Sequence, residues 1–245
     1  QCGICNNCIS VRAYQEQKYF MKIEKGTGPT MVVTALPVQN ADLPLVIELL
    51  KDASGLIYMG SGVYDQGVPM EAALVEMNEA IVTDHLTRLY NRRFIDERLP
   101  VDSVRSVAEN EPLSVLFLDM DNLKEINDTL GHVFGDRAIG MVADCIRKNI
   151  REGQDWAARY GGDEFVVCLN NTGRETAMSI AERIRQGVQG LSVSDCALQF
   201  PVTVTIGIRS SEGEQLTAED FLNQADTLMK KAKHDGKNRI QGSGA

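Results

Sequence analysis

An apolar run at residues 113–118, LSVLFL, in which Ser114 is the one polar residue, constrains the fold of this chain more than any other feature. Two acids, Asp119 and Asp121, come at its end. Five of its six residues are apolar, and such a run without polar alternation is typical of a strand that is covered on both faces. We therefore expect a buried β-strand whose carboxyl end carries charged side chains.

Helix and strand patterns alternate after this run. A helical stretch at about 122–150, with breaks at Gly131 and Gly135, is followed by strands 156–160 and 165–169 around a Gly-Gly-Asp-Glu turn. The remaining expected elements are a helix at 174–187, a strand at 201–209, a helix from a Thr217 capping box to about His234, and a strand at 238–241. The order predicts an α/β (α+β) fold with a split βαβ, mainly antiparallel sheet and helices on one side.

The first fifty residues have a different pattern. Short β-favouring runs at 17–25, 30–38 and 43–50 are separated by turn residues, and a short helical stretch at 11–17 precedes them. This pattern predicts a helix followed by a three-stranded antiparallel meander. The unit is too short to hold a large core alone.

A possible coiled-coil seam lies between the two parts. Met70, Leu74, Met77 and Ile81 are spaced by four, three and four residues. Two interpretations are open from the spacing: a helix that packs on its own domain, or the seam of a dimer.

Charge and hydropathy exclude two classes of partner. The net charge of −9 over 245 residues gives no basic footprint for a nucleic-acid duplex. No apolar run approaches the roughly 18 residues of a membrane-spanning helix, so no membrane segment is expected in this chain.

Acids and lysines are distributed as a phosphate-transfer site requires. Asp119 and Asp121 are expected on one face of the strand, and the hairpin brings Asp163 and Glu164 within reach. Clustered carboxylates attract a hard divalent cation, for which Mg²⁺ is the natural choice. The other interpretation of a single acid here is a helix cap.

Lysines complete this pattern. Lys124 follows the first acids, and the end of the last helix carries Lys230, Lys231, Lys233 and Lys237. Such a cluster also complements a helix dipole. Together with the acids and the glycine turn, it indicates phosphoryl or nucleotidyl transfer.

The six cysteines are unevenly distributed. Cys2, Cys5 and Cys8 are spaced as ligands of zinc or an iron–sulfur cluster, but a fourth ligand is missing, so thiols without a ligand role are the alternative. The other three, Cys145, Cys168 and Cys196, are expected to be core residues.

Five blocks of residues, 84–94, 119–128, 131–136, 159–165 and 232–238, together resemble the GGDEF domains of bacterial diguanylate cyclases. The resemblance covers residues 84 to about 241. It implies a palm-like GGDEF fold over residues 84–243, with a central, mainly antiparallel sheet flanked by helices. The activity it implies is the condensation of two GTP into cyclic di-GMP with release of pyrophosphate. It also implies a cytoplasmic, bacterial protein.

The resemblance implies a role for each matching residue. Asp119, the main-chain carbonyl of Met120, Asp163 and Glu164 would bind Mg²⁺ or Mn²⁺, two ions per half-site. Asp163 and Glu164 would also be catalytic, with Asp163 taking the proton of the attacking 3′-hydroxyl. Lys124 would offset the charge that develops on the phosphates.

The same resemblance implies how GTP is held. The residues implied for substrate binding are Asn127, His132 and Asp136 at the guanine, Lys233 and Lys237 at the terminal phosphates, and Gly161, Gly162 and Leu123. The acid Asp136 favours GTP alone. Lys237 stands where the family usually has Arg, and Leu123 where Phe is common.

The inhibitory site that many members carry is degenerate here. Its Asp is present as Asp155, but its Arg is replaced by Glu152, with Arg151 one residue away. We therefore predict weak or absent inhibition by the product.

Residues 1–57 resemble the C-terminal half of a PAS-type sensor domain, and residues 58–83 its signalling helix. Because each half-site holds one GTP, the resemblance implies a homodimer through the linker helix and facing GGDEF domains, controlled by the sensor segment. The alternative is a silent GGDEF module that only binds nucleotide or a signalling partner.

Overall fold

The computed structural model describes residues 9–16, 18–25, 30–38, 46–52, 82–195, 198–211 and 214–242. They belong to two compact units that divide between residues 82 and 83, and each unit is described by itself. The predicted seam at 70–81 lies outside the described residues, and the domain limits 1–57, 58–83 and 84–243 stay predictions. Within the described ranges, no helix is long and apolar enough to cross a membrane.

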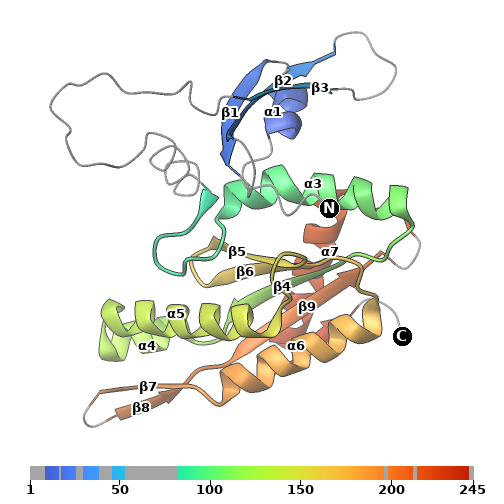
Figure 1. Ribbon diagram of the computed structural model, residues 1–245. Helices are drawn as coiled ribbons and strands as arrows, with labels where there is room; N and C mark the ends of the chain where they lie inside the picture. The colour runs from blue at the N-terminus through green and yellow to red at the C-terminus, as the bar shows by residue number, and fades with distance from the viewer. Residues whose placement is uncertain are drawn as a thin grey trace, which may run out of the picture. The chain divides into compact units, whose positions relative to one another are not determined.

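The N-terminal unit is one helix on a three-stranded sheet (Figure 1). Helix α1 (Ile9–Glu16) is followed by β1 (Phe20–Lys25), β2 (Thr30–Pro37) and β3 (Val46–Asp52). The strands pair in sequence order and are all antiparallel. A small core joins helix and sheet through Ile9, Ala13, Val33 and Ala35. The predicted meander is confirmed, whereas its PAS-like identity stays a prediction.

The second unit is built on a five-stranded sheet in the order β10-β9-β4-β6-β5. Its strands are β4 (Ser114–Met120), β5 (Trp156–Gly161), β6 (Glu164–Leu169), β9 (Val204–Ser210) and β10 (Ile240–Gly242). All pairs are antiparallel except β10 with β9. Every residue of β4 is buried, which confirms the predicted buried strand in the centre of a mainly antiparallel sheet.

Helices cover both faces of this sheet (Figure 1). Helices α3 (Arg92–Glu109) and α7 (Ala218–His234) lie on one face, and α4 (Leu123–Leu130), α5 (His132–Asn149) and α6 (Arg174–Gln189) on the other. The element order alone predicted helices on one side, which is wrong, whereas the central, mainly antiparallel sheet flanked by helices is confirmed. The physical reason is in the run 113–118, which has no polar alternation and supplies apolar side chains to both faces.

The predicted stretch 122–150 is two helices that meet at Gly131, whose φ of +93° lies in the left-handed region. Gly135 does not interrupt the second helix, contrary to the prediction. It is buried inside α5 against α4, where an added Cβ would lie 1.9 Å from Asn127 Oδ1. This glycine permits close helix packing and breaks no helix.

Two further elements are absent from the predicted order. Helix α3 has no clear apolar face, because it buries Glu97, Arg98 and Asp102 beside its apolar residues. The hairpin of β7 (Ser192–Asp195) and β8 (Leu198–Pro201) takes the start of the predicted strand 201–209. The predicted capping box is confirmed: the Thr217 and Asp220 side chains each accept the other residue's backbone N–H at the start of α7.

Candidate functional site

The end of β4 and the β5–β6 hairpin bring three acids together. Asp119 pairs with Glu164 across the β4–β6 ladder, and the Met120 N–H donates to the Asp163 carbonyl at 3.0 Å. Gly162 has φ +53° at the hairpin tip, a conformation that glycine adopts without steric cost. The tight tip therefore fixes Asp163 beside the end of the central strand.

Burial and mutual repulsion set the ionisation of these acids. Burial raises the pKa of Asp119 to about 6; the ion pair with Lys233 lowers it in part, and the charges of Asp163 and Glu164 raise it. Burial also raises the pKa of Glu164, and Asp163 and Asp226 add to this. The positive charge near these carboxylates is therefore too small to offset their negative charge when they are ionised.

A cleft of about 480 Å³ lies beside these acids, of which Asp163 lines it and Asp119 and Glu164 do not. Its lining residues are Met120, Asn122, Leu123, Lys124, Glu125, Asp128, Thr129, Asp163, Lys233 and Lys237. Six of them were predicted site residues: Met120, Leu123, Lys124, Asp163, Lys233 and Lys237. Of the four lining residues that were not predicted, three lie on α4: Glu125, Asp128 and Thr129. Asp128 and Thr129 come three and four residues after Glu125, and Asp128 comes four after Lys124, so they share one helix face, and this spacing could have identified them.

The lysines from α7 and its following turn lie close to the acids. Lys233 forms an ion pair with Asp119, and Lys237 Nζ donates to Asn122 Oδ1 at 2.6 Å. Lys124 is exposed at the start of α4. Three cations therefore surround one cleft, which suits a polyphosphate ligand.

The three residues predicted at the guanine lie beside this cleft but do not line it. Asn127 packs against Gly135 where α4 crosses α5, and Asp136 follows directly. His132 and Asp136 are exposed on the first turns of α5. The helix crossing thus holds Asn127 next to the turn that carries Asp136.

The donor chemistry of the acids fits a hard divalent cation, although no ready ligand cage is present. Asp119 is 8% exposed, and its Oδ1 accepts no hydrogen bond of regular geometry despite the contact with Lys233. Carboxylate oxygens of this kind suit Mg²⁺ or Mn²⁺. Across the described ranges, no three His, Cys, Asp or Glu side chains already form a metal-binding group.

Arg159 links the hairpin tip to the start of the unit and was not predicted as a site residue. Its Nε and Nη2 donate to the Gly162 carbonyl at 2.9 and 2.7 Å, and its Nη1 lies 3.3 Å from Asp84 Oδ2. Asp84 also accepts hydrogen bonds from the Thr87 N–H and hydroxyl. Arg159 therefore connects the glycine turn to Asp84 and fixes the position of the Gly162 carbonyl.

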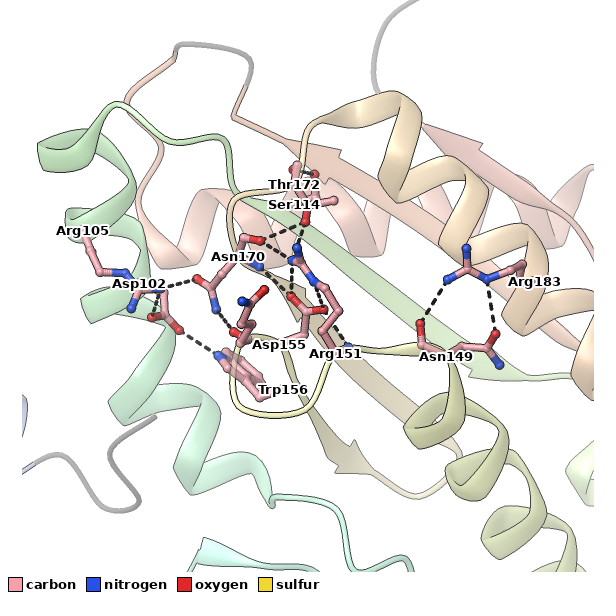
Figure 2. Close-up of polar contacts among 11 residues, drawn as sticks. Asp102, Arg105, Ser114, Asn149, Arg151, Asp155, Trp156, Asn170, Thr172 and Arg183 are labelled. Carbon is pink, nitrogen blue, oxygen red and sulfur yellow. Dashed lines mark hydrogen bonds and ion pairs between the residues drawn. The ribbon is translucent and has the colours of Figure 1, made fainter. Parts of the chain in front are cut away.

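Asp155 is part of a closed polar network (Figure 2). It is 4% exposed and accepts two hydrogen bonds from the Arg151 guanidinium, at 2.9 and 2.7 Å. The Asn170 N–H donates to it at 3.1 Å. Glu152 is exposed. Cys2, Cys5 and Cys8 lie outside the described residues.

Comparisons with known proteins bear on residues 81–239, which match the family described as "Diguanylate cyclase, GGDEF domain". The response regulator PleD of Caulobacter vibrioides is 39% identical over 68% of this chain and 37% of its own length. Diguanylate cyclase A of Treponema denticola is 37% identical over 67% of this chain and 45% of its own length. The chain thus spans less than half the length of these relatives.

Solved structures show the same fold. The coiled coil and GGDEF domain of DgcB from Caulobacter crescentus, in complex with c-di-GMP, has a TM-score of 0.67 at 25% identity and covers 71% of this chain and 92% of that chain. SiaD from Pseudomonas aeruginosa, in complex with its activator SiaC, has a TM-score of 0.65 at 32% identity, covering 71% and 66%.

Proposed function

The chain belongs to the GGDEF diguanylate cyclase family, and from this we propose that it condenses two molecules of GTP into cyclic di-GMP. In each of two steps, a 3′-hydroxyl oxygen attacks an α-phosphate, one P–O bond forms, and pyrophosphate leaves. The observation that carries the proposal is the cleft in which Asp163, Lys233 and Lys237 meet above the buried Asp119.

We assign the phosphates to the lysines. Lys233 neutralises Asp119 in the nucleotide-free protein, and we propose that it exchanges this partner for a terminal phosphate when GTP binds. Lys237 and Lys124 hold further phosphate oxygens from the turn after α7 and from α4. Most catalysis in phosphoryl transfer comes from such positioning and charge neutralisation.

Asp119, Asp163, Glu164 and the Met120 carbonyl would hold Mg²⁺ or Mn²⁺. When bound, the metal supplies neutralisation of phosphate charge and orientation of the reacting groups. The 3′-hydroxyl proton passes to Asp163 or Glu164. Burial raises the pKa of Glu164 above the ordinary value of a glutamate, so its carboxylate is a stronger base than that of an exposed glutamate.

We assign the guanine to Asn127, Asp136 and His132, with Gly161 and Gly162 leaving room at the hairpin tip. A carboxylate at Asp136 accepts from the N1–H and 2-amino groups of guanine, which adenine lacks. We propose that the enzyme works as a homodimer, with residues 58–83 as the dimer helix and the N-terminal unit as its sensor.

The test is incubation of the protein with GTP and Mg²⁺, followed by chromatography and mass spectrometry of the products. Cyclic di-GMP and pyrophosphate are expected with GTP and neither with ATP. The variant Asp163→Ala/Glu164→Ala should lose at least about a hundredfold in rate, whereas Glu109→Gln, at the far end of α3, should retain it. Tight GTP binding without product would instead identify a silent nucleotide-binding module.

A further inference from the structure

Asp121 is a buried carboxylate to which the proposed mechanism gives no role. Only 2% of it is exposed, and it does not line the cleft. Its Oδ1 accepts from Thr205 Oγ1 at 2.7 Å, and its Oδ2 from Thr203 Oγ1 at 2.8 Å. Oδ2 also accepts the backbone N–H of Asn238 at 3.1 Å. Both oxygens are therefore used inside the protein.

The segment that Asp121 reaches is an unusual turn. Gly236, Lys237 and Asn238 have φ of +118°, +60° and +45°, so three successive residues lie in the left-handed region. Glycine and asparagine tolerate this conformation, but a lysine seldom adopts it. Such backbone persists only where surrounding contacts fix it, and it is concentrated at functional sites.

Contacts from β9, α6, α7 and the residue after the end of β4 fix this turn. The Asn238 N–H donates to Asp121 Oδ2 and also to Thr205 Oγ1, each at 3.1 Å. Arg185 Nη1 from α6 donates to Asn238 Oδ1 at 2.9 Å, and the Lys237 N–H donates to the Ala232 carbonyl at 3.2 Å. Asp121 contributes an acceptor that the hydroxyls of Thr203 and Thr205 hold in place.

The consequence concerns Lys237, whose side chain lines the cleft. We propose that Asp121 is a positioning residue: it holds the turn 236–238 in its left-handed conformation so that Lys237 stands over the cleft. The two acids at the end of the central strand thus have different contacts, Asp119 with Lys233 and Asp121 with the turn. This inference rests on the proposed function only in taking nucleotide phosphate as the ligand of Lys237.

The first test is a double-mutant cycle on the affinity for a non-hydrolysable GTP analogue, measured by calorimetry with Mg²⁺. Asp121→Ala and Lys237→Ala are each expected to weaken binding about tenfold, and the double variant no further, because both remove the same contact. If the double variant instead lost about a hundredfold in affinity, the product of the two single losses, the inference would be overturned.

A conservative variant tests whether the hydrogen bonds of residue 121, and not a general loss of folding, account for the effect. In Asp121→Asn the amide oxygen can still accept from Asn238 and Thr203, while the amide nitrogen donates to the Thr205 hydroxyl. It should bind the analogue nearly as wild type does. A loss as large as that of Asp121→Ala would overturn the positioning role.

The second test needs no nucleotide. Hydrogen exchange at the Asn238 amide is expected to be faster in Asp121→Ala but unchanged in the control Ser114→Ala, which removes a buried hydroxyl at the opposite end of β4. Unchanged exchange in both would overturn the inference. If Asp121→Ala does not fold, Thr203→Val, which removes a hydrogen bond to Asp121 Oδ2 and leaves the Asn238 amide untouched, should also speed this exchange, though less.

These readouts keep the two proposals apart. If the wild-type protein does not bind the analogue, the proposed function fails, while the exchange measurement still decides the role of Asp121. If wild type binds and Asp121→Ala binds equally well, the inference fails alone.

Discussion

Asp119 is the residue whose ionisation should most affect the stability of the metal-free protein. Its pKa rises from 3.8 to about 6, first because of burial. The folded state therefore holds this proton more tightly than the unfolded state, and stability is lost as the pH rises through about 6. In the absence of metal, Asp119→Asn should raise the free energy of unfolding near neutral pH by roughly 1–2 kcal/mol.

Urea denaturation of both proteins in a chelating buffer, near neutral pH and at about pH 5, checks this. The gain should shrink at the lower pH, where wild-type Asp119 is itself protonated. A variant less stable than wild type near neutral pH would mean that the ion pair with Lys233 outweighs the cost of burial.

Asp155 is expected to serve the fold and not product binding. Because its oxygens are taken by Arg151 and the Asn170 N–H, Asp155→Ala leaves a buried amide without its acceptor. The free energy of unfolding should fall by about 1–3 kcal/mol. Added cyclic di-GMP should inhibit wild type and variant equally weakly in rate assays. Strong inhibition of wild type that this substitution relieves would contradict the expectation.

Sequence spacing predicts part of this site and misses another part for a physical reason. The expected fold order makes the first strand and the two-glycine hairpin neighbours in one sheet, which is enough to bring Asp163 and Glu164 near Asp119. The roles of Arg159 and Asp121 depend on partners 75 and 117 residues away along the chain. No local period carries such information, so only the folded sheet shows it.

The contact of α4 with α5 depends on a missing side chain. An added Cβ at Gly135 would lie 1.9 Å from Asn127 Oδ1 and 3.3 Å from Leu123 Cδ1. Gly135→Ala should therefore move Asn127, reduce stability by about 1–3 kcal/mol and weaken binding of a GTP analogue. Gly140→Ala is the matched control, because nothing lies within 4 Å of its added Cβ. Equal affinity in the two variants would exclude a role for this helix contact in binding.

The β5–β6 hairpin should depend on Arg159 for its catalytic geometry. Removing the guanidinium frees the Gly162 carbonyl and loosens Asp163 beside it. We expect Arg159→Ala to lower kcat about tenfold or more with a smaller change in KM. Arg159→Lys should recover little, since one ammonium cannot replace a planar fork. Steady-state kinetics check this, and an unchanged kcat would contradict it.

An element can be predicted from the sequence when local patterns determine it, and cannot when distant tertiary contacts stabilise it. Strand β4 and helix α7 were predicted because their apolar pattern and capping box act locally. Helix α3 was not, because its buried face uses polar pairs: Asp102 accepts from the Trp156 indole at 2.7 Å and from Arg98 at 3.0 Å. A helix stabilised by such tertiary contacts has no amphipathic signature to read.

At the scale of the whole molecule, the proposed reaction needs two copies of the second unit. The described residues of the second unit provide one group of acids and one set of lysines around one cleft. The product joins two nucleotides through two equivalent bonds, so each nucleotide must be presented by its own cleft. Two chains facing each other supply this by symmetry.

This requirement predicts how the rate depends on protein concentration. If two chains must meet, the initial rate per mole of protein should rise with concentration and level off where dimers predominate. Adding the Asp163→Ala/Glu164→Ala chain in excess to a limiting amount of wild type should suppress the rate, because most wild-type chains then pair with an inactive half-site. The same excess of Lys237→Ala/Asp163→Ala should suppress it equally. A rate per mole that is independent of concentration, and unaffected by inactive chains, would mean that one chain completes the reaction, and the dimer would lose its place in the mechanism.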